Sequence, residues 1–448
     1  MTGGQSPTGP QGHHAALVRY AVVVTVRQVR QTERIRPGAT AERSLLREWG
    51  MCRWIWNTLT AKSRDEHLFN QIGAANGAHH DELPTFGYAE QDKHLTRLRQ
   101  ATVDPDTGER WLAAGSSVAQ QQTVRDFAAA RSKALLDRKN KITGGRRRGL
   151  PRFKSRHMAA PSMNYTRRGF TLKPHPDTGR VALALPGGVL IPVVWTRDLP
   201  SDPKSVRVSR DSLGHWYASF VVEFDDTDTA LPALPQPRAI GVDWGVTETA
   251  TTVTVDLATG VIDAGTAFDL PHAQHGKTMA QKLARYQRMM SRRRTPKGNP
   301  PSRGYTEAKR LAAKAHKKVA RQRQDDARKW AKRVVTAHDR IAVEDFKPKF
   351  LTRSTMARKA ADGRIATAKA ELIWQATKTG RDLRPVHPRH TTTDCSNCDA
   401  RTKHRLPLGQ RTYTCETCGV VKPRDKNSAA VMVARAGFDP ADVEGVRP

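Results

Sequence analysis

Four of the five cysteines form two Cys-x2-Cys pairs separated by sixteen residues: Cys395, Cys398, Cys415 and Cys418. Each pair can place two thiolates on one turn, and the spacer lies within the roughly 15–20 residues of zinc ribbons. Four thiolates complete a tetrahedral site and leave no position for water, so the pattern predicts one structural Zn²⁺. Two disulfides are the alternative, which a reducing compartment disfavours. The fifth, Cys52, stands alone, as is typical of a buried small hydrophobe.

Three carboxylates occupy positions where an acid is costly to bury unless it is paired or binds a metal. Asp243 ends one short apolar strand, Glu344 ends a second, and Asp425 precedes the expected terminal helix. If they converge, they would bind two Mg²⁺ ions about 4 Å apart, one activating water and the other stabilising the leaving 3′-oxygen of a phosphodiester. Each acid alone is more often a cap or turn residue than a ligand. Asp345 should point to the opposite face of its strand.

The charge predicts a polyanion partner. The chain of 448 residues carries 76 Lys and Arg against 43 Asp and Glu, a net charge of +33. Residues 125–156 hold twelve basic and two acidic residues, and residues 277–333 hold twenty and three. Solvated helical faces are the alternative, but like charges at this density repel one another. We therefore expect nucleic acid as the partner, ahead of an anionic membrane.

The apolar segments and the N-terminal residues indicate where in the cell the protein is located. The apolar runs are far shorter than the roughly 18 residues of a membrane span, and the first residues lack the pattern of a secretion signal. We therefore expect a cytoplasmic, nucleoid-associated protein with no membrane partner. A monomer is favoured.

The N-terminal half predicts strands around a helical block. Residues 19–29 alternate as a strand, residues 41–62 have helical periodicity, and Ser116 or Ser117 can cap a helix running to about Lys139. Short strands from 152 to 224 are typical of a small β-barrel that carries nucleic acid on its face. Trp54 and Trp56 fit core packing better than base stacking.

An acidic and then Pro-rich stretch, 225–237, predicts the main boundary between the two halves. Beyond it the pattern is α/β, with a basic helical hairpin over 277–335 interrupted at 296–304. Ala366, Ala370, Ile373 and Ala376 are in register on a helix over 365–378. Strands are expected at 239–243, 249–256, 261–268, 340–346 and 382–386, and a last helix at 427–435.

The order of these motifs resembles the TnpB family of transposon-encoded nucleases, relatives of the type V CRISPR effectors. The resemblance is strong over 239–436 and weaker before it, and the stretches 63–115 and 277–335 are hard to align. Ser428 stands where alanine is usual. The resemblance to this family rests on Gly241-Val-Asp-Trp-Gly245, Val343-Glu-Asp345, the cysteine quartet, Asp425-x-Asn427-x-Ala429 and, more weakly, Pro151-Arg-Phe-Lys-Ser155.

The resemblance implies an α/β fold with an RNase H-like (RuvC) nuclease domain, residues 238–390 and 420–438. A zinc ribbon, residues 391–419, would be inserted before the third acid. Before the nuclease domain we expect a wedge-like β-barrel domain at 17–40 and 140–224, with a helical recognition insertion at 41–139. The remaining segments are a disordered leader (1–16), the linker (225–237) and a frayed tail (439–448).

The same resemblance implies RNA-guided cleavage of double-stranded DNA beside a short adjacent motif, with guide RNA and target DNA as partners. By matching motifs, Asp243, Glu344 and Asp425 would be the catalytic ligands of two Mg²⁺ ions, and the cysteine quartet would bind Zn²⁺. One alternative is a catalytically silent guided repressor, although all three acids are present. Another is a DNA transposase that uses the same acids to join ends.

Overall fold

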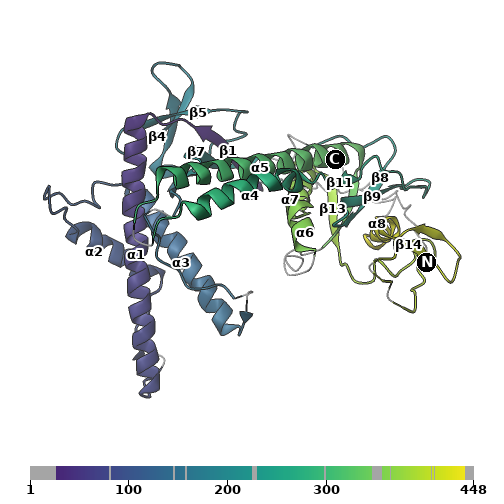
Figure 1. The fold of residues 1–448 in the computed structure, drawn as a ribbon, viewed down its shortest axis with the longest axis horizontal. Coiled ribbons are helices and arrows are strands. Elements are labelled where there is room, and N and C mark those ends of the chain that lie inside the picture. Colours follow the sequence, from purple (N-terminus) through teal and green to yellow (C-terminus); the bar gives the residue numbers. More distant parts are fainter. Residues whose placement is uncertain are drawn as a thin grey trace, which may run out of the picture.

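The computed structural model describes residues 27–79, 82–144, 147–156, 159–224, 230–296, 299–345, 356–363, 365–404, 406–407 and 409–438. The expected leader, the first part of the 19–29 strand, part of the linker and the tail lie outside these residues. The described chain forms two large sheets, joined by long helices that run from one sheet to the other (Figure 1), and a small two-stranded ribbon. None of the helices within these ranges is long and apolar enough to cross a membrane.

The first sheet is antiparallel, with strand order β2-β6-β7-β1-β5-β4-β3. Its edge strands β2 and β3 are consecutive in the chain and are linked by a single 3₁₀ turn, Arg167–Gly169. The two edges are therefore held near each other, and the sheet curls into a half-barrel. Its strands are β1 Arg27–Ile35, β2 Ser162–Thr166, β3 Thr171–Pro174, β4 Val181–Leu185, β5 Val189–Val194, β6 Ser205–Arg210 and β7 Trp216–Phe224.

Strand β1 runs further along the chain than its apolar pattern predicted, reaching Ile35. Its inward side chains include the polar pair Gln31 and Glu33, which alternation alone would place outside. They are tolerated because Glu33 accepts hydrogen bonds from Gln31 Nε2 (3.0 Å) and from Thr196 Oγ1 (2.8 Å). The segment expected as a strand at 152–154 has no strand structure.

Three helices lie between β1 and β2: α1 Ala39–Ala75, α2 Tyr88–Ala101 and α3 Ser117–Lys139. The predicted cap is confirmed, because Ser116 Oγ accepts the Ala119 amide (3.3 Å). Trp54 and Trp56 pack edge to face against Trp111 and Phe127, as expected of core residues. Cys52 is buried against the half-barrel, which raises the pKa of its thiol to about 12 and makes it unreactive.

The second sheet has the order β10-β9-β8-β12-β13, and β11 also pairs with β9. Strands β8, β12 and β13 are parallel, whereas β9 is antiparallel to β8. The carboxyl ends of three parallel strands therefore form one edge of the sheet. The strands are β8 Arg238–Trp244, β9 Glu248–Asp256, β10 Ile262–Asp263, β11 Leu270–Pro271, β12 Arg340–Glu344 and β13 Asp382–Val386.

Helices cover both faces of the second sheet. On one face, α5 and α7 bury Trp330, Val334 and Leu372 against Ile240, Val242, Ile341 and Val343. On the other, α8 packs Met432 and Val433 against Ala239 and Ala342. The buried side of α7 is Ile365, Ala368, Leu372 and Ala376, so only Ala376 of the predicted register is correct. The helices are α4 His275–Arg292, α5 Arg303–Ala337, α6 Ala357–Gly363, α7 Ile365–Lys378 and α8 Arg424–Arg435.

Helix α5 also contacts the half-barrel (Figure 1). Lys317 donates hydrogen bonds to Tyr217 Oη (2.6 Å) and to the carboxylate of Asp211, at the β6–β7 turn. The predicted basic hairpin thus exists as α4 and α5, and it links the two sheets.

Gly241 allows α8 to approach β8 closely. A Cβ at this position would lie 1.9 Å from the carbonyl oxygen of Ala429, a backbone atom that cannot rotate away. We expect Gly241→Ala to lower the free energy of unfolding by about 3 kcal/mol, as overpacking does, and the melting temperature by about 6–12 °C.

Gly50→Ala is the matched control for this prediction. Nothing lies within 4 Å of a Cβ at Gly50, which sits inside α1, so alanine should leave the melting temperature unchanged or raise it. A Gly241→Ala protein that melts within about 1 °C of the wild type would contradict the account of this contact.

Candidate active site and metal centre

Two of the three predicted acids, Asp243 and Glu344, lie on one face of the second sheet. Side chains alternate along a strand, so Asp243 shares a face with Ala239 and Gly241, and Glu344 shares one with Ala342. That face is the one covered by α8. Val242 and Val343 are register partners, so Asp243 and Glu344 follow at neighbouring positions of parallel strands.

Asp425 comes from α8 itself. The helix begins at Arg424, three residues before the predicted start, so Asp425 lies in its first turn rather than in front of it. A carboxylate there is favoured by the helix dipole. Its side chain is 34% exposed and accepts hydrogen bonds from Arg424 Nε and Nη2, both at 3.2 Å, while Arg411 Nη1 lies 3.6 Å away.

The electrostatics bring the three acids into one group. Burial raises the pKa of Asp243 well above its usual range, and the charges of Glu344 and Asp425 raise it further. Burial also raises the pKa of Glu344 to about 7, against the opposing effect of the Trp244 backbone N–H. Within the described ranges, no hydrogen bond or ion pair is formed by the Asp243 carboxylate.

The carboxylate oxygens of the three acids do not all lie close to one another. Among the residues that the structure describes, the cysteine quartet is the only set of three or more candidate ligands whose atoms all lie within 4.8 Å of one another. The acids therefore form an open arrangement. Asp345 is confirmed on the opposite face, where it binds Lys369 Nζ of α7 at 3.1 Å.

Two residues to which the sequence analysis gave no role position Asp425: Lys426, which it did not name, and Asn427, which it named only as part of a motif. Lys426 is buried, and its ammonium donates to the Thr252 and Gly265 carbonyls (both 2.8 Å) and to Asp269 (2.8 Å). Asn427 is fully buried; it donates to the Asp394 carbonyl (2.7 Å) and accepts the Ser396 amide (3.0 Å). The two side chains fasten the start of α8 to the second sheet and to the cysteine ribbon.

The four cysteines converge as predicted. The sulfur atoms of Cys395 and Cys418 are 3.7 Å apart, and those of Cys398 and Cys415 are 3.6 Å apart. All four are free thiols, so the two-disulfide alternative is wrong. The ribbon that supports them pairs β14 Thr412–Thr414 with β15 Val421–Pro423 around the buried Tyr413.

Each cysteine pair sits on a similar turn. The residue after the second cysteine, Asp399 or Gly419, has positive φ (56° and 71°), and its amide donates to the carbonyl of the first cysteine of the pair at 3.0 Å. The Cys418 amide also donates to Cys415 Sγ (3.5 Å) and lowers the pKa of that thiol to about 6. Four soft sulfur donors in one small cluster fit tetrahedral Zn²⁺.

The longest basic stretch forms α4 and α5. Helix α5 buries one side, whereas none of the residues of α4, all of which the structure describes, is buried. Lys282, Arg285 and Arg288 of α4 therefore remain available to a polyanion.

Two family models match the chain. The OrfB_IS605 model, described as "Probable transposase", matches residues 219–355, and the Cas12f1-like TNB domain model matches residues 367–432. The first segment contains Asp243 and Glu344, and the second contains the cysteine quartet and Asp425. A Streptomyces pristinaespiralis protein named as a candidate RNA-guided DNA endonuclease is 29% identical over 342 residues, which are 75% of this chain and 76% of that protein. These matches support a TnpB-family protein.

Another relative matches a longer part of the chain. InsQ of Escherichia coli K12, also named as a candidate RNA-guided DNA endonuclease, is 25% identical over 421 residues, 89% of this chain and 90% of InsQ. Among solved structures, a Cas12f1–sgRNA–target DNA complex matches 91% of this chain and 98% of its own, with 12% identity and a TM-score of 0.45. The mini-RNA-guided endonuclease CRISPR-Cas_phi3 matches 93% of each chain, with 9% identity and a TM-score of 0.47.

Proposed function

We propose that this chain is an RNA-guided DNA endonuclease of an insertion-sequence transposon, which cleaves double-stranded DNA beside a short adjacent motif. The observation that carries the proposal is the placement of Asp243 and Glu344 on the α8 face of one sheet and of Asp425 in the first turn of α8, with both other acids within electrostatic reach of Asp243. The names of the two relatives and the exposed basic helix α4 support it.

The acid trio fits Mg²⁺ by the chemistry of its donors, because carboxylate oxygens are the ligands that this ion prefers. Bound there, a pair of ions would supply activated water and stabilise the leaving 3′-oxygen. The chain's own residues hold these donors in place: the Trp244 amide orients Glu344, and Arg424 holds Asp425. Cation binding would displace protons from Asp243 and Glu344, whose pKa values burial raises.

We further propose that the second sheet is an RNase H-like (RuvC) nuclease domain and that the half-barrel is a wedge-like domain, with the boundaries expected from the sequence. The half-barrel, α1–α3 and the α4–α5 hairpin would hold the guide RNA and the heteroduplex. Base pairing with the guide would then read the target sequence, and the protein would read the adjacent motif.

A DNA transposase is the second candidate, because the OrfB_IS605 model carries that description. The same acids would serve, with a 3′-hydroxyl as nucleophile in place of water. Product analysis separates the two: free ends support hydrolysis, and joined ends support strand transfer.

The first test is the RNA that copurifies with the protein expressed from its native locus. We expect sequencing to find one discrete species that maps to the flank of the gene, because a guided enzyme retains its guide. The Asp243→Ala protein is the control and should retain the same species. A diffuse sample of cellular RNA in both preparations would overturn guided cleavage as the function.

A further inference from the structure

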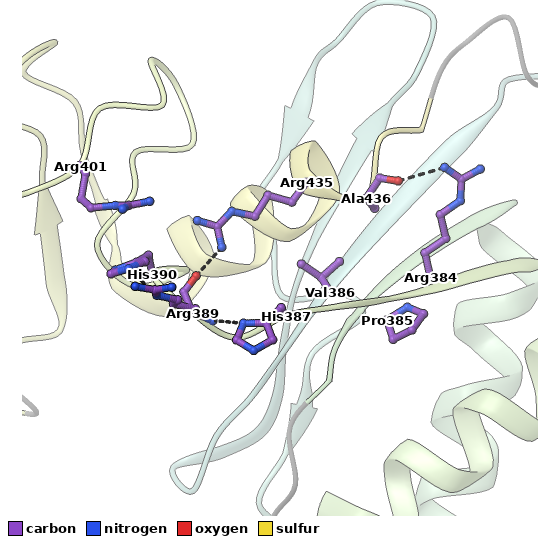
Figure 2. Close-up of a pocket in the computed structure, with 9 residues that line it drawn as sticks. All are labelled: Arg384, Pro385, Val386, His387, Arg389, His390, Arg401, Arg435 and Ala436. Carbon is purple, nitrogen blue, oxygen red and sulfur yellow. Dashed lines mark hydrogen bonds between the residues drawn. The ribbon is translucent and has the colours of Figure 1, made fainter.

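A basic pocket of about 670 Å³ lies where β13, α8 and the cysteine ribbon meet (Figure 2). It contains four arginines and two histidines, and none of its nine lining residues is acidic. Such a lining favours an anion over a neutral or cationic ligand. Its polar lining residues are Arg384, His387, Arg389, His390, Arg401 and Arg435.

Protein contacts already orient most of these cations. Asp394 accepts two hydrogen bonds from Arg401 (2.6 and 3.0 Å) and also pairs with Arg435. Arg435 Nη1 donates to the Arg389 carbonyl at 2.6 Å, and Arg384 Nη1 donates to the Ala436 carbonyl at 2.9 Å (Figure 2). The charges are therefore held in place before any ligand arrives, which lowers the entropic cost of binding.

Arg389 has unused hydrogen-bond donors on both of its terminal nitrogens. Its side chain is exposed, and Nε donates to His390 Nε2 at 3.0 Å. Its two terminal nitrogens have no acceptor within the described part of the chain. A guanidinium with both terminal nitrogens available matches the paired oxygens of a phosphate group.

The loop that carries Arg389 is fixed in an uncommon conformation. His390 has φ of 64°, in the left-handed region that non-glycine residues adopt at a cost of roughly 1–3 kcal/mol. Its carbonyl accepts the Thr393 and Asp394 amides at 3.1 and 3.0 Å, and His387 Nδ1 accepts the Arg389 amide at 3.1 Å. Surrounding contacts thus maintain the strain, as is common at binding sites.

The pocket continues the edge that carries the acid trio. Val386, which lines it, is the register partner of Glu344, and its carbonyl accepts the Asp345 amide at 2.7 Å. Strand β8, with Asp243, is two strands from β13, or about 10 Å at the spacing of paired strands. At about 3.4 Å of rise per nucleotide, this separation corresponds to roughly three nucleotides.

We propose that this pocket binds a backbone phosphate of the DNA strand being cut, a few nucleotides from the scissile bond, with Arg389 as its main ligand. This inference rests on the proposed function and adds a positioning site to it. The phosphate would hold the strand across the edge where Asp243 and Glu344 lie. Arg389 is a positioning residue, because it does not touch the reacting atoms.

The test replaces single phosphates of the target strand with uncharged methylphosphonates. In the wild type, a methylphosphonate at one position a few nucleotides from the cut should slow single-turnover cleavage by about 10- to 100-fold, the value of a charge-assisted hydrogen bond. In Arg389→Ala, cleavage of the unmodified strand should slow by a similar factor, and the same methylphosphonate should add less than about threefold. Arg389→Lys should recover part of the rate, because lysine restores the positive charge but lacks the paired terminal nitrogens of the guanidinium.

Lys403→Ala is the control variant. Lys403 is an exposed cation of the same ribbon that does not line the pocket, so this variant should show the wild-type response to the methylphosphonate. Melting temperatures of all variants should stay within about 2 °C of the wild type, because the Arg389 side chain is exposed.

A second readout separates failure of the pocket from failure of the proposed function. Affinity for the same oligonucleotides is measured by anisotropy in the Asp243→Ala background, without divalent cations. If wild-type cleavage is normal and no position responds to Arg389 in either readout, the pocket assignment is overturned and the function stands. If the wild type does not cleave but one phosphate position depends on Arg389 for binding, the pocket is supported and the function is overturned.

Discussion

Asp243→Ala should reduce guided cleavage of double-stranded DNA by about a thousandfold or more while changing affinity for guide RNA and target DNA by less than about twofold. The acid offers an oxygen ligand at the centre of the trio, and charge stabilisation by a catalytic ion contributes several kcal/mol to the barrier. Nucleic-acid affinity depends on the basic surfaces, which this substitution leaves intact. Single-turnover cleavage of a target plasmid and filter binding measure the two quantities.

Asp345→Ala is the matched control. It removes one carboxylate from the same sheet edge, but on the opposite face, where Asp345 pairs with Lys369. We expect it to cleave within about threefold of the wild type. Cleavage retained by Asp243→Ala, or lost equally in both variants, would show that the acids are not the ligands that we assign. Asp243→Asn, which keeps the shape and removes the charge, should behave like the alanine variant.

The two-residue period of strands explains why this part of the site could be predicted. Asp243 and Glu344 each end a short apolar run, and strands of that kind are buried in a sheet whose edge they share. The cap at Ser116 was an equally local signal, and it is present in the structure. Local patterns of this kind need no knowledge of the partner element.

What could not be predicted depends on residues far apart in the chain. Lys426 is buried because Asp269, 157 positions away, and two carbonyls satisfy its ammonium, and no periodicity links them. The same limit applies to the register of α7. Alanines occur on several sides of that helix, and only its packing against α5 and the sheet shows which side is buried. The polar strand β1 was missed beyond residue 29 because Glu33 is buried by a pairing with Thr196.

Cys395→Ser should remove zinc and lower the stability of the C-terminal part of the chain. A structural Zn²⁺ contributes about 10–16 kcal/mol of apparent binding free energy in small zinc domains, so loss of one thiolate ligand is costly. We expect about one zinc per chain in the wild type and much less in the variant, by mass spectrometry of the purified protein. The midpoint temperature of the first thermal transition should fall by about 10 °C or more. A shift of this size requires the loss of only about 3–5 kcal/mol of unfolding free energy. Cys398→Ser should give the same result.

The effect should reach the acid trio through α8. Asn427, two residues after Asp425, is held by the Asp394 carbonyl and the Ser396 amide, which flank Cys395. A ribbon without its metal no longer fixes these two groups, so cleavage should fall even at temperatures where the second sheet remains folded. His404→Ala is the control, because this exposed histidine lies on the same ribbon outside the sulfur cluster and should keep both zinc and activity. If Cys395→Ser melts like the wild type and neither protein contains zinc, the four thiols are not a structural metal site, and α8 must be held by Lys426 and the sheet alone.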